Sequence, residues 1–227
     1  MDLLPFEEES FDGQLPLFPL PNVVLLPGGL LSLHIFEQRY RDMVKAAAAG
    51  DQLIGMASLK PGYEGEYDGN PPIYKEACLG EMTRDLELPD GRWLITLRGL
   101  RRVEILEEDL SRSFRIATVR LMRDSPGTTK VELARSRRLI AELMTRVPGV
   151  DSESEGLRRL IGADESSVPT SLWLDLLAAV APLEVEDRRE LLSAKTLCER
   201  AHLLLGGLVH VIDGHLEGLE QRVLGGC

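Results

Sequence analysis

The sequence is short of aromatic residues, cysteine pairs and long apolar runs, and each shortage excludes a class of protein. Aromatic residues make up 5% of the 227 residues, so a core has to consist mostly of Leu, Val, Ile and Ala. The three cysteines, Cys78, Cys198 and Cys227, are odd in number and form no C-x-x-C motif. A disulfide scaffold and a structural zinc site are therefore disfavoured, and a reducing cytoplasm is the simpler expectation.

No apolar run approaches the ~18–20 residues that a membrane-spanning helix needs. The longest run starts at Val23 and is interrupted by Pro27, Gly28 and Gly29. The opening residues, MDLLPFEEES, also lack the basic start and the apolar stretch of a signal peptide. We therefore expect a cytoplasmic protein without a membrane partner.

The net charge is −11, and acidic residues gather at the start of the chain. Five of them precede Gly13, with no Lys or Arg among them: Asp2, Glu7, Glu8, Glu9 and Asp12. We expect residues 1–13 to form a disordered acidic tail. The rest of the chain is acidic too, and nucleic-acid binding depends on clustered Lys and Arg, so we expect no nucleic-acid partner.

Residues 14–123 have the pattern of a β-domain. Short apolar runs between Pro and Gly turns predict strands at residues 15–20, 23–26, 30–35, 53–59, 78–88, 92–97, 103–106 and 114–121. Prolines in the first run favour an edge strand or an irregular segment, and Gly99 to Arg102 predict a turn. One amphipathic helix is expected between Phe36 and Gly50. Closing six or more strands into a barrel removes exposed edges.

Residues 124–227 change to helical spacing. The apolar positions predict helices at residues 131–147, 157–161, 172–180, 185–192 and 195–224, and the glycines at 206, 207, 214 and 218 weaken the last of these. The fold class is therefore α+β, with a β-domain at residues 14–123 and a helical domain at residues 124–227.

Residues 60–77 form a turn-rich loop that carries three tyrosines, Tyr63, Tyr67 and Tyr74. Tyrosine on an adaptable loop is typical of partner binding, and Arg39 on the preceding helix extends this candidate contact surface. The alternative is a loop that is folded over the barrel, with its rings covering the core and the helix charges only solvated.

For the other candidate sites, a structural role is favoured over catalysis or metal binding. His34 and Cys78 lack a third group that would complete a nucleophilic site, so a buried structural Cys78 is favoured. His202, His210 and His215 are spaced by eight and five residues, whereas metal ligands on a helix favour a spacing of four. We expect no catalytic residue, no metal and no cofactor.

Three blocks of sequence resemble the N-terminal substrate-binding domain of Lon proteases. They are LPLFPLPNVVLLPGGLLSLHIFEQRY (residues 15–40), LPDGRWLITLRGLRRVEIL (88–106) and LWLDLLAAVAPLEVEDRRELLSAKTLCERAHLLLGGL (172–208). They are especially similar to stand-alone bacterial relatives that consist of this domain without the protease. The resemblance implies a PUA-like β-barrel followed by an α-helical bundle, a role related to proteolysis, and binding of protein or peptide segments.

The resemblance stops short of the family's enzymatic parts. There is no G-x-x-x-x-G-K-[ST] motif to bind ATP phosphates, and the 227 residues leave no room for a protease domain. We therefore expect a non-catalytic module that binds unfolded segments or a partner on the barrel and in the groove beside the helical domain. The family also implies a homo-oligomer.

Two alternatives stay open. One is a cytosolic hydrolase with an unrecognised site, which requires a nucleophile and a base within hydrogen-bond reach. The other is an RNA-binding PUA-like domain, for which Arg92, Arg98, Arg101 and Arg102 are the basic cluster, although acidic residues follow at once.

Overall fold

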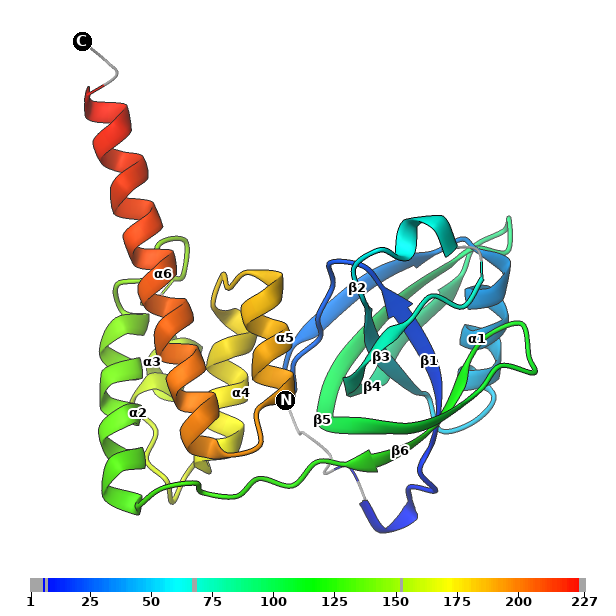
Figure 1. The fold of residues 1–227 in the computed structure, drawn as a ribbon, viewed down its shortest axis with the longest axis horizontal. Helices are drawn as coiled ribbons and strands as arrows, with labels where there is room; N and C mark the ends of the chain where they lie inside the picture. The colour runs from blue at the N-terminus through cyan, green and yellow to red at the C-terminus, as the bar shows by residue number, and fades with distance from the viewer. Residues whose placement is uncertain (1–5, 7, 67–68, 152, 225–227) are drawn as a thin grey trace. The chain divides into compact units, whose positions relative to one another are not determined.

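Six strands form one sheet in the computed structural model, in the order β2-β5-β4-β3-β1-β6 (Figure 1). Their bounds are β1 Gln14–Leu20, β2 Leu30–Ile35, β3 Leu53–Leu59, β4 Ile73–Glu87, β5 Trp93–Asp109 and β6 Ile116–Leu121. An additional pairing between β5 and β6 closes β1, β3, β4, β5 and β6 into a barrel. Strand β2 pairs with β5 alone and extends the sheet beyond the closure. The predicted barrel is confirmed, and its form is consistent with a PUA-like fold.

The chain divides into two units, Met1–Met122 with the barrel and Arg123–Cys227 with the helices. The structure describes residues 6, 8–66, 69–151 and 153–224, with side chains up to residue 217. Within these limits, no helix is long and apolar enough to cross a membrane.

Alternate residues along the strands point into the barrel. The inward side chains are aliphatic and almost completely buried, among them Leu15, Leu17, Leu79 and Val103, each at 0% exposure. This period of two is the one expected of a strand with one buried face. The buried residues of this cluster are aliphatic, and partly buried aromatic rings pack against them.

The helix α1, Gln38–Ala48, follows β2 directly and covers the barrel with one apolar face. Tyr40 is the anchor of this face: its ring lies 4.5 Å from the ring of Phe18, and its hydroxyl donates to the carbonyl of Pro19 at 3.4 Å. Because α1 is held in this way, the end of β2 is fixed in place.

A backbone clamp holds the start of β2 against β5. The amide of Gly28 donates to the carbonyl of Gly99 at 2.8 Å, and the amide of Gly99 donates to the carbonyl of Gly29 at 2.9 Å. A Cβ atom at Gly99 would lie 2.1 Å from the carbonyl oxygen of Leu26, so only glycine permits this approach.

Three expectations for the strands are wrong. Residues 23–26 form no strand, and Gly99 to Arg102 make no turn, because β5 runs through them with a register shift against β4. Strand β1 is not an edge, since it lies between β3 and β6. Its prolines are tolerated because residues 14–16 pair with β6 and residues 17–20 with β3, so each part uses one side of the backbone.

The N-terminal segment differs from the expected disordered tail wherever it is described. Residues Glu8–Ser10 form a 3-10 helix, and Phe6 and Phe11 pack against the barrel core with ring centroids 5.7 Å apart. Glu8 also forms an ion pair with Arg101 at 3.2 Å. Two aromatic side chains therefore outweigh the acidic composition that predicted disorder. Residues 1–5 and 7 lie outside the described part.

In the part of the second unit that the structure describes, five helices follow in the predicted order. They are α2 Lys130–Met144, α3 Glu155–Ile161, α4 Thr170–Val180, α5 Val185–Ser193 and α6 Leu197–Leu224. The largest fully buried apolar side chains include Ile140, Met144 and Trp173. Thr129 and Glu132 form a capping box at the start of α2, which satisfies two backbone amides there. The glycines do not interrupt α6.

A buried cation joins three segments of this unit. Arg200 on α6 is 1% exposed, and its guanidinium donates to Asp175 of α4 at 2.5 Å and to Asp124. Burial alone lowers the pKa of Arg200, but the two carboxylates outweigh burial, and the pKa is raised from its ordinary value. The cluster therefore holds the start of the unit against α4 and α6.

Candidate functional site

The outer face of β2, β5 and β4 exposes apolar side chains to solvent. Along β2, Leu30, Ser32 and His34 point outward, and Phe36 continues the series beyond the strand. Leu94 lies opposite His34 on β5, and Leu86 lies opposite Leu94 on β4. We call this set the β2 face: Leu30, Ser32, His34, Phe36, Leu86 and Leu94.

Four members of the β2 face are large apolar residues with high exposure. Leu30 is 64% exposed, Phe36 62%, Leu86 54% and Leu94 41%. Their neighbours on the opposite face, such as Ile35, Ile95 and Leu97, are at most 2% exposed. One side of this part of the sheet is therefore core, whereas the other presents four exposed apolar side chains on or next to three neighbouring strands, a grouping that is typical of interaction sites.

The backbone of β2 has an open edge. Because hydrogen-bonded pairs alternate in an antiparallel ladder, the bond between Gly99 and Gly29 places Leu31, Leu33 and Ile35 in the pairs bonded to β5. The peptide groups of Ser32 and His34 then point away from β5. Among the described residues, no strand pairs with this edge. An extended peptide could add there as a further strand.

Polar and charged side chains border the apolar part of the β2 face. The hydroxyl groups of Ser32 and Thr96 lie 3.5 Å apart, and Arg98 forms an ion pair with Glu81 next to Leu30 in the register. The rings of His34 and Phe36 lie 6.2 Å apart at a tilt of 58°. This arrangement of an apolar centre with a polar border is typical of protein contact surfaces.

The predicted contact residues near the loop have mainly local partners. Tyr63 lies on the 3-10 helix Tyr63–Glu66 and packs half-buried against the barrel core, whereas Tyr74 lies on β4, with the ammonium of Lys60 5.8 Å from its ring. Tyr67 lies outside the described residues. Arg39 donates to Glu37 at 2.9 Å and to the carbonyl of Gly69 at 3.3 Å, so it holds the loop to α1. Their part in partner binding stays a prediction.

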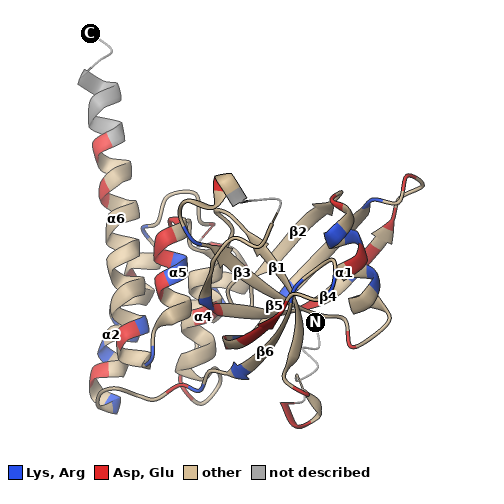
Figure 2. Cartoon of the chain, turned by 45° about the vertical axis from the view of Figure 1, so that its right-hand side comes forward, with Lys and Arg blue, Asp and Glu red and all other residues tan. Residues whose placement is uncertain are grey.

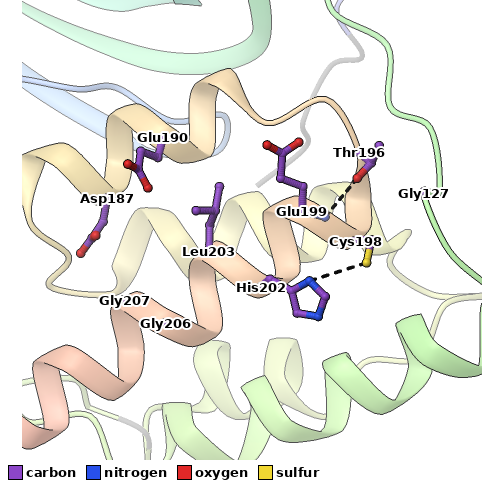
Figure 3. A pocket seen from close by; sticks show the side chains of 10 residues that line it. All are labelled: Gly127, Asp187, Glu190, Thr196, Cys198, Glu199, His202, Leu203, Gly206 and Gly207. Atoms are coloured by element: carbon purple, nitrogen blue, oxygen red, sulfur yellow. Dashed lines mark hydrogen bonds between the residues drawn. The ribbon is translucent and has the colours of Figure 1, made fainter.

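A separate candidate site is a hollow of about 570 Å³ beside the first turns of α6 in the helical unit (Figure 3). It contains a thiol and an imidazole one helical turn apart: Cys198 Sγ lies 3.7 Å from His202 Nδ1. Sequence reasoning considered His202 only with the other histidines and missed this pair, although the spacing of four residues was visible.

The surroundings of Cys198 do not suit acyl transfer. Such chemistry needs backbone amides that are free to stabilise an oxyanion. The first amides of α6 are already used, because Leu197 donates to Ser125, Cys198 donates to Pro126 and Glu199 donates to Thr196. Within the described part of the chain, no group of three or more His, Cys, Asp and Glu is placed to hold a metal ion.

The pair His34 and Cys78, which the sequence analysis disfavoured, is also unsuited to catalysis. Cys78 is completely buried in β4 and its thiol contacts the carbonyl of Leu79 at 3.5 Å, whereas His34 is exposed on the β2 face. A buried thiol is inert as a nucleophile.

The arginine cluster of β5 is neutralised. Arg92 pairs with Asp90 at 2.6 Å, Arg98 with Glu81, and Arg101 with Glu8 at 3.2 Å, while Arg102 is only 4% exposed. Figure 2 shows acidic residues beside basic ones on the barrel. The geometry is that of a charged border and not of a phosphate-binding row.

The chain thus combines a closed barrel, which has an exposed apolar sheet face, with a unit of helices. The sequence from residue 14 to 210 matches the family described as the ATP-dependent protease La (LON) substrate-binding domain, and the chain belongs to that family. The family predicted from the three sequence blocks is confirmed.

Curated relatives are whole Lon proteases. Lon protease from Cytophaga hutchinsonii is 27% identical over 218 residues, which is 95% of this chain and 26% of that protein. Lon protease 2 from Myxococcus xanthus is 26% identical over 205 residues, 87% of this chain and 24% of that protein. The chain therefore spans about a quarter of the length of the relatives it matches.

Two solved structures share the fold. A Lon N-terminal domain protein from Xanthomonas campestris has a TM-score of 0.60 at 24% identity, covering 85% of this chain and 97% of that one. The N-terminal domain of Lon protease from Mycobacterium avium complex has a TM-score of 0.64 at 16% identity, covering 86% and 98%. At these identities the likeness shows the fold alone.

Proposed function

We propose that this protein binds extended apolar segments of unfolded or partner proteins on the β2 face. The observation that carries the proposal is the coincidence of an open strand edge with four exposed apolar side chains on the same sheet. An extended segment would pair its backbone with Ser32 and His34 and lay alternate side chains beside Leu30 and Phe36, and a long apolar side chain would extend across His34 to Leu94. Membership in a substrate-binding family supports a protein ligand.

The surface suits an apolar protein segment better than RNA. The four arginines on and just before β5 are paired or buried, so a phosphate backbone would find few free cations in this cluster. The Cys198–His202 hollow likewise gives no support to a hydrolase, because the amides that an oxyanion would need are occupied.

The test is titration of a fluorescent, reduced and alkylated protein that cannot fold, followed by anisotropy. The double variant Phe36→Ser/Leu94→Ser removes apolar surface that is 62% and 41% exposed. Because full burial of such a side chain contributes roughly 1.5–3 kcal/mol, we expect a combined loss of about 2 kcal/mol, which is roughly 30-fold in Kd.

The matched control is Leu106→Ser/Leu110→Ser, since both leucines are 48% exposed in the barrel unit but lie outside the β2 face. We expect this control to bind the probe like the wild type. Equal weakening by both double variants would show that binding is non-specific, and no weakening by Phe36→Ser/Leu94→Ser would refute the assignment.

Strand addition can be separated from simple apolar contact. Ser32→Pro removes one outward amide, whereas the bonds between β2 and β5 stay intact. We expect weaker probe binding with an unchanged thermal midpoint. Unchanged binding would mean that the partner contacts the face without pairing with the edge.

We further propose that the loop tyrosines form an accessory contact. The triple variant of Tyr63, Tyr67 and Tyr74 to Ser should weaken capture of the unfolded probe less than Phe36→Ser/Leu94→Ser does, because Tyr63 and Tyr74 are partly covered. Full retention of binding would remove the loop from the contact surface.

A further inference from the structure

The helical unit contains an apolar pocket of about 750 Å³ that the proposed function does not use. Its walls come from α2, from the segment between α3 and α4, and from Leu197 at the start of α6. Trp173 of α4 also lines it. The volume falls within the ~300–1,000 Å³ of typical small-molecule sites.

Several of the residues that line the pocket are small. Ala134 and Ala141 lie seven residues apart on α2, and Gly162 and Ala163 follow α3. Larger side chains at these places would fill the space, as they do in the core around Ile140 and Met144. The hollow is therefore encoded by particular residues.

Hydrogen bonds and a ring contact hold Arg137 and Trp173, which line the pocket, in place. The guanidinium of Arg137 lies 4.5 Å from the ring centroid of Trp173 and donates to the carbonyl of Ala163 at 2.6 Å. The indole of Trp173 donates to the carbonyl of Leu160 at 2.7 Å. A ligand would meet a preformed surface, which lowers the entropic cost of binding.

The two acidic side chains that line the pocket are already engaged. Asp164 accepts from Ser166 and Ser167, and Glu165 accepts from the amide of Thr170 and from Arg137. These contacts tie both carboxylates to their own segment of chain. Hydrogen bonds do not remove the charge of a carboxylate, but three basic side chains, Lys130, Arg137 and Arg138, line the pocket against these two acidic ones.

Two basic side chains that line the pocket have no such partner. Lys130 and Arg138 line it, and within the part of the chain that the structure describes neither forms an ion pair with a carboxylate; Arg138 only donates to the carbonyl of Ala134 at 3.4 Å. The pocket is thus complementary to one anionic group attached to an apolar body.

We propose that this pocket binds a medium-chain carboxylate, with its hydrocarbon tail along the alanines of α2 and its carboxylate at Lys130 and Arg138. The probe is decanoate, titrated by calorimetry below its micelle concentration. Decylammonium, which has the same tail length and the opposite charge, is the matched ligand control. We expect decanoate to bind one site per chain at least tenfold more tightly than decylammonium.

Two pairs of variants separate the pocket from the surface. Ala134→Phe fills the pocket and should abolish decanoate binding, whereas Leu139→Phe, at a 44% exposed position of the same helix, should bind like the wild type. Lys130→Gln/Arg138→Gln should weaken decanoate about tenfold, whereas Arg158→Gln/Arg159→Gln on α3 should not. Far-ultraviolet circular dichroism and thermal midpoints check that each variant is folded.

Three results would overturn the proposal. They are the absence of decanoate binding to the wild type, equal affinities for decanoate and decylammonium, and undiminished decanoate binding by folded Ala134→Phe. None of these bears on the β2 face, which lies in the other unit, so the unfolded-protein probe tests the proposed function separately.

Discussion

Replacing Arg200 with Met should destabilise the helical unit more than any surface change. The guanidinium is 1% exposed and bridges Asp175, whose side chain is 13% exposed, and Asp124, at 25%. Met keeps much of the side-chain volume but leaves a nearly buried carboxylate without its cation. Breaking a buried pair in this way costs about 3–5 kcal/mol, a large part of the 5–15 kcal/mol that typically stabilises a domain.

The two tryptophans allow each unit to be followed by itself. Trp173 lies in the helical unit and Trp93 in the barrel, and the chain has 2 tryptophans in all. In a Trp93→Phe background, urea unfolding reports on the helices. With a slope of roughly 1.5 kcal/mol per molar urea, Arg200→Met should lower the midpoint by about 2–3 M.

A second substitution provides the control. Asp175→Leu in the Arg200→Met background removes the stranded carboxylate, and because replacing a whole buried pair with apolar residues is close to neutral, it should recover most of the lost stability. A midpoint shift below about 0.5 M for Arg200→Met would refute the reasoning. If Trp93 reported an equal shift of the urea midpoint, the cluster would also affect the stability of the barrel.

Two further predictions concern the barrel and the response to acid. Gly99→Ala should lower the thermal midpoint of the barrel by several degrees, because the new Cβ would lie 2.1 Å from the backbone of Leu26. Gly65 has open space around it, so the control Gly65→Ala should leave the midpoint unchanged. The hydroxyl of Ser166 and the amide and hydroxyl of Ser167 lower the pKa of Asp164 to about 2. The contribution of Asp164 to stability is therefore present above pH 4 and is lost as the pH falls towards 2. Asp164→Asn should therefore flatten the decline of the Trp173-reported urea midpoint between pH 4 and pH 2, and an equally steep decline in both proteins would contradict this role.

The local patterns of the sequence were sufficient to predict most elements. Short apolar runs between turn signals located β2 and β3, and the spacing of Tyr40, Met43, Val44 and Ala47 located α1. The change from strand patterns to helical spacing near residue 124 predicted the order of the two parts, and the family resemblance added the PUA-like form of the barrel. These predictions succeeded because each depends on residues that are near one another in the chain.

Failures arose where distant pairing overrides a local signal. The prolines of β1 indicated an edge, but the strand changes partner at Leu17 and so uses one side of its backbone at a time. Gly99 indicated a turn, but it lies in a continuous strand beside Leu26. In both cases the deciding contact lies many residues away and has no periodic signature.

The candidate surfaces were harder to predict than the fold. The sequence directed attention to the loop tyrosines, whereas the exposed apolar residues lie on β2, β4 and β5. Which side of β2 is covered depends on closure of the barrel by β5 and β6, and this cannot be inferred from the alternation of LLSLHI alone. The pocket of the helical unit depends in the same way on which small residues face one another.

Amide hydrogen exchange on the whole protein, followed residue by residue by NMR, tests the central claim most directly. On saturation with the reduced and alkylated protein probe, the account predicts slower exchange at the outward amides of Ser32 and His34, because a bound segment pairs with them. The inward amides of Leu31 and Leu33, already bonded to β5, should change much less. Saturated binding with unchanged exchange at Ser32 and His34 would contradict recognition at the edge of β2.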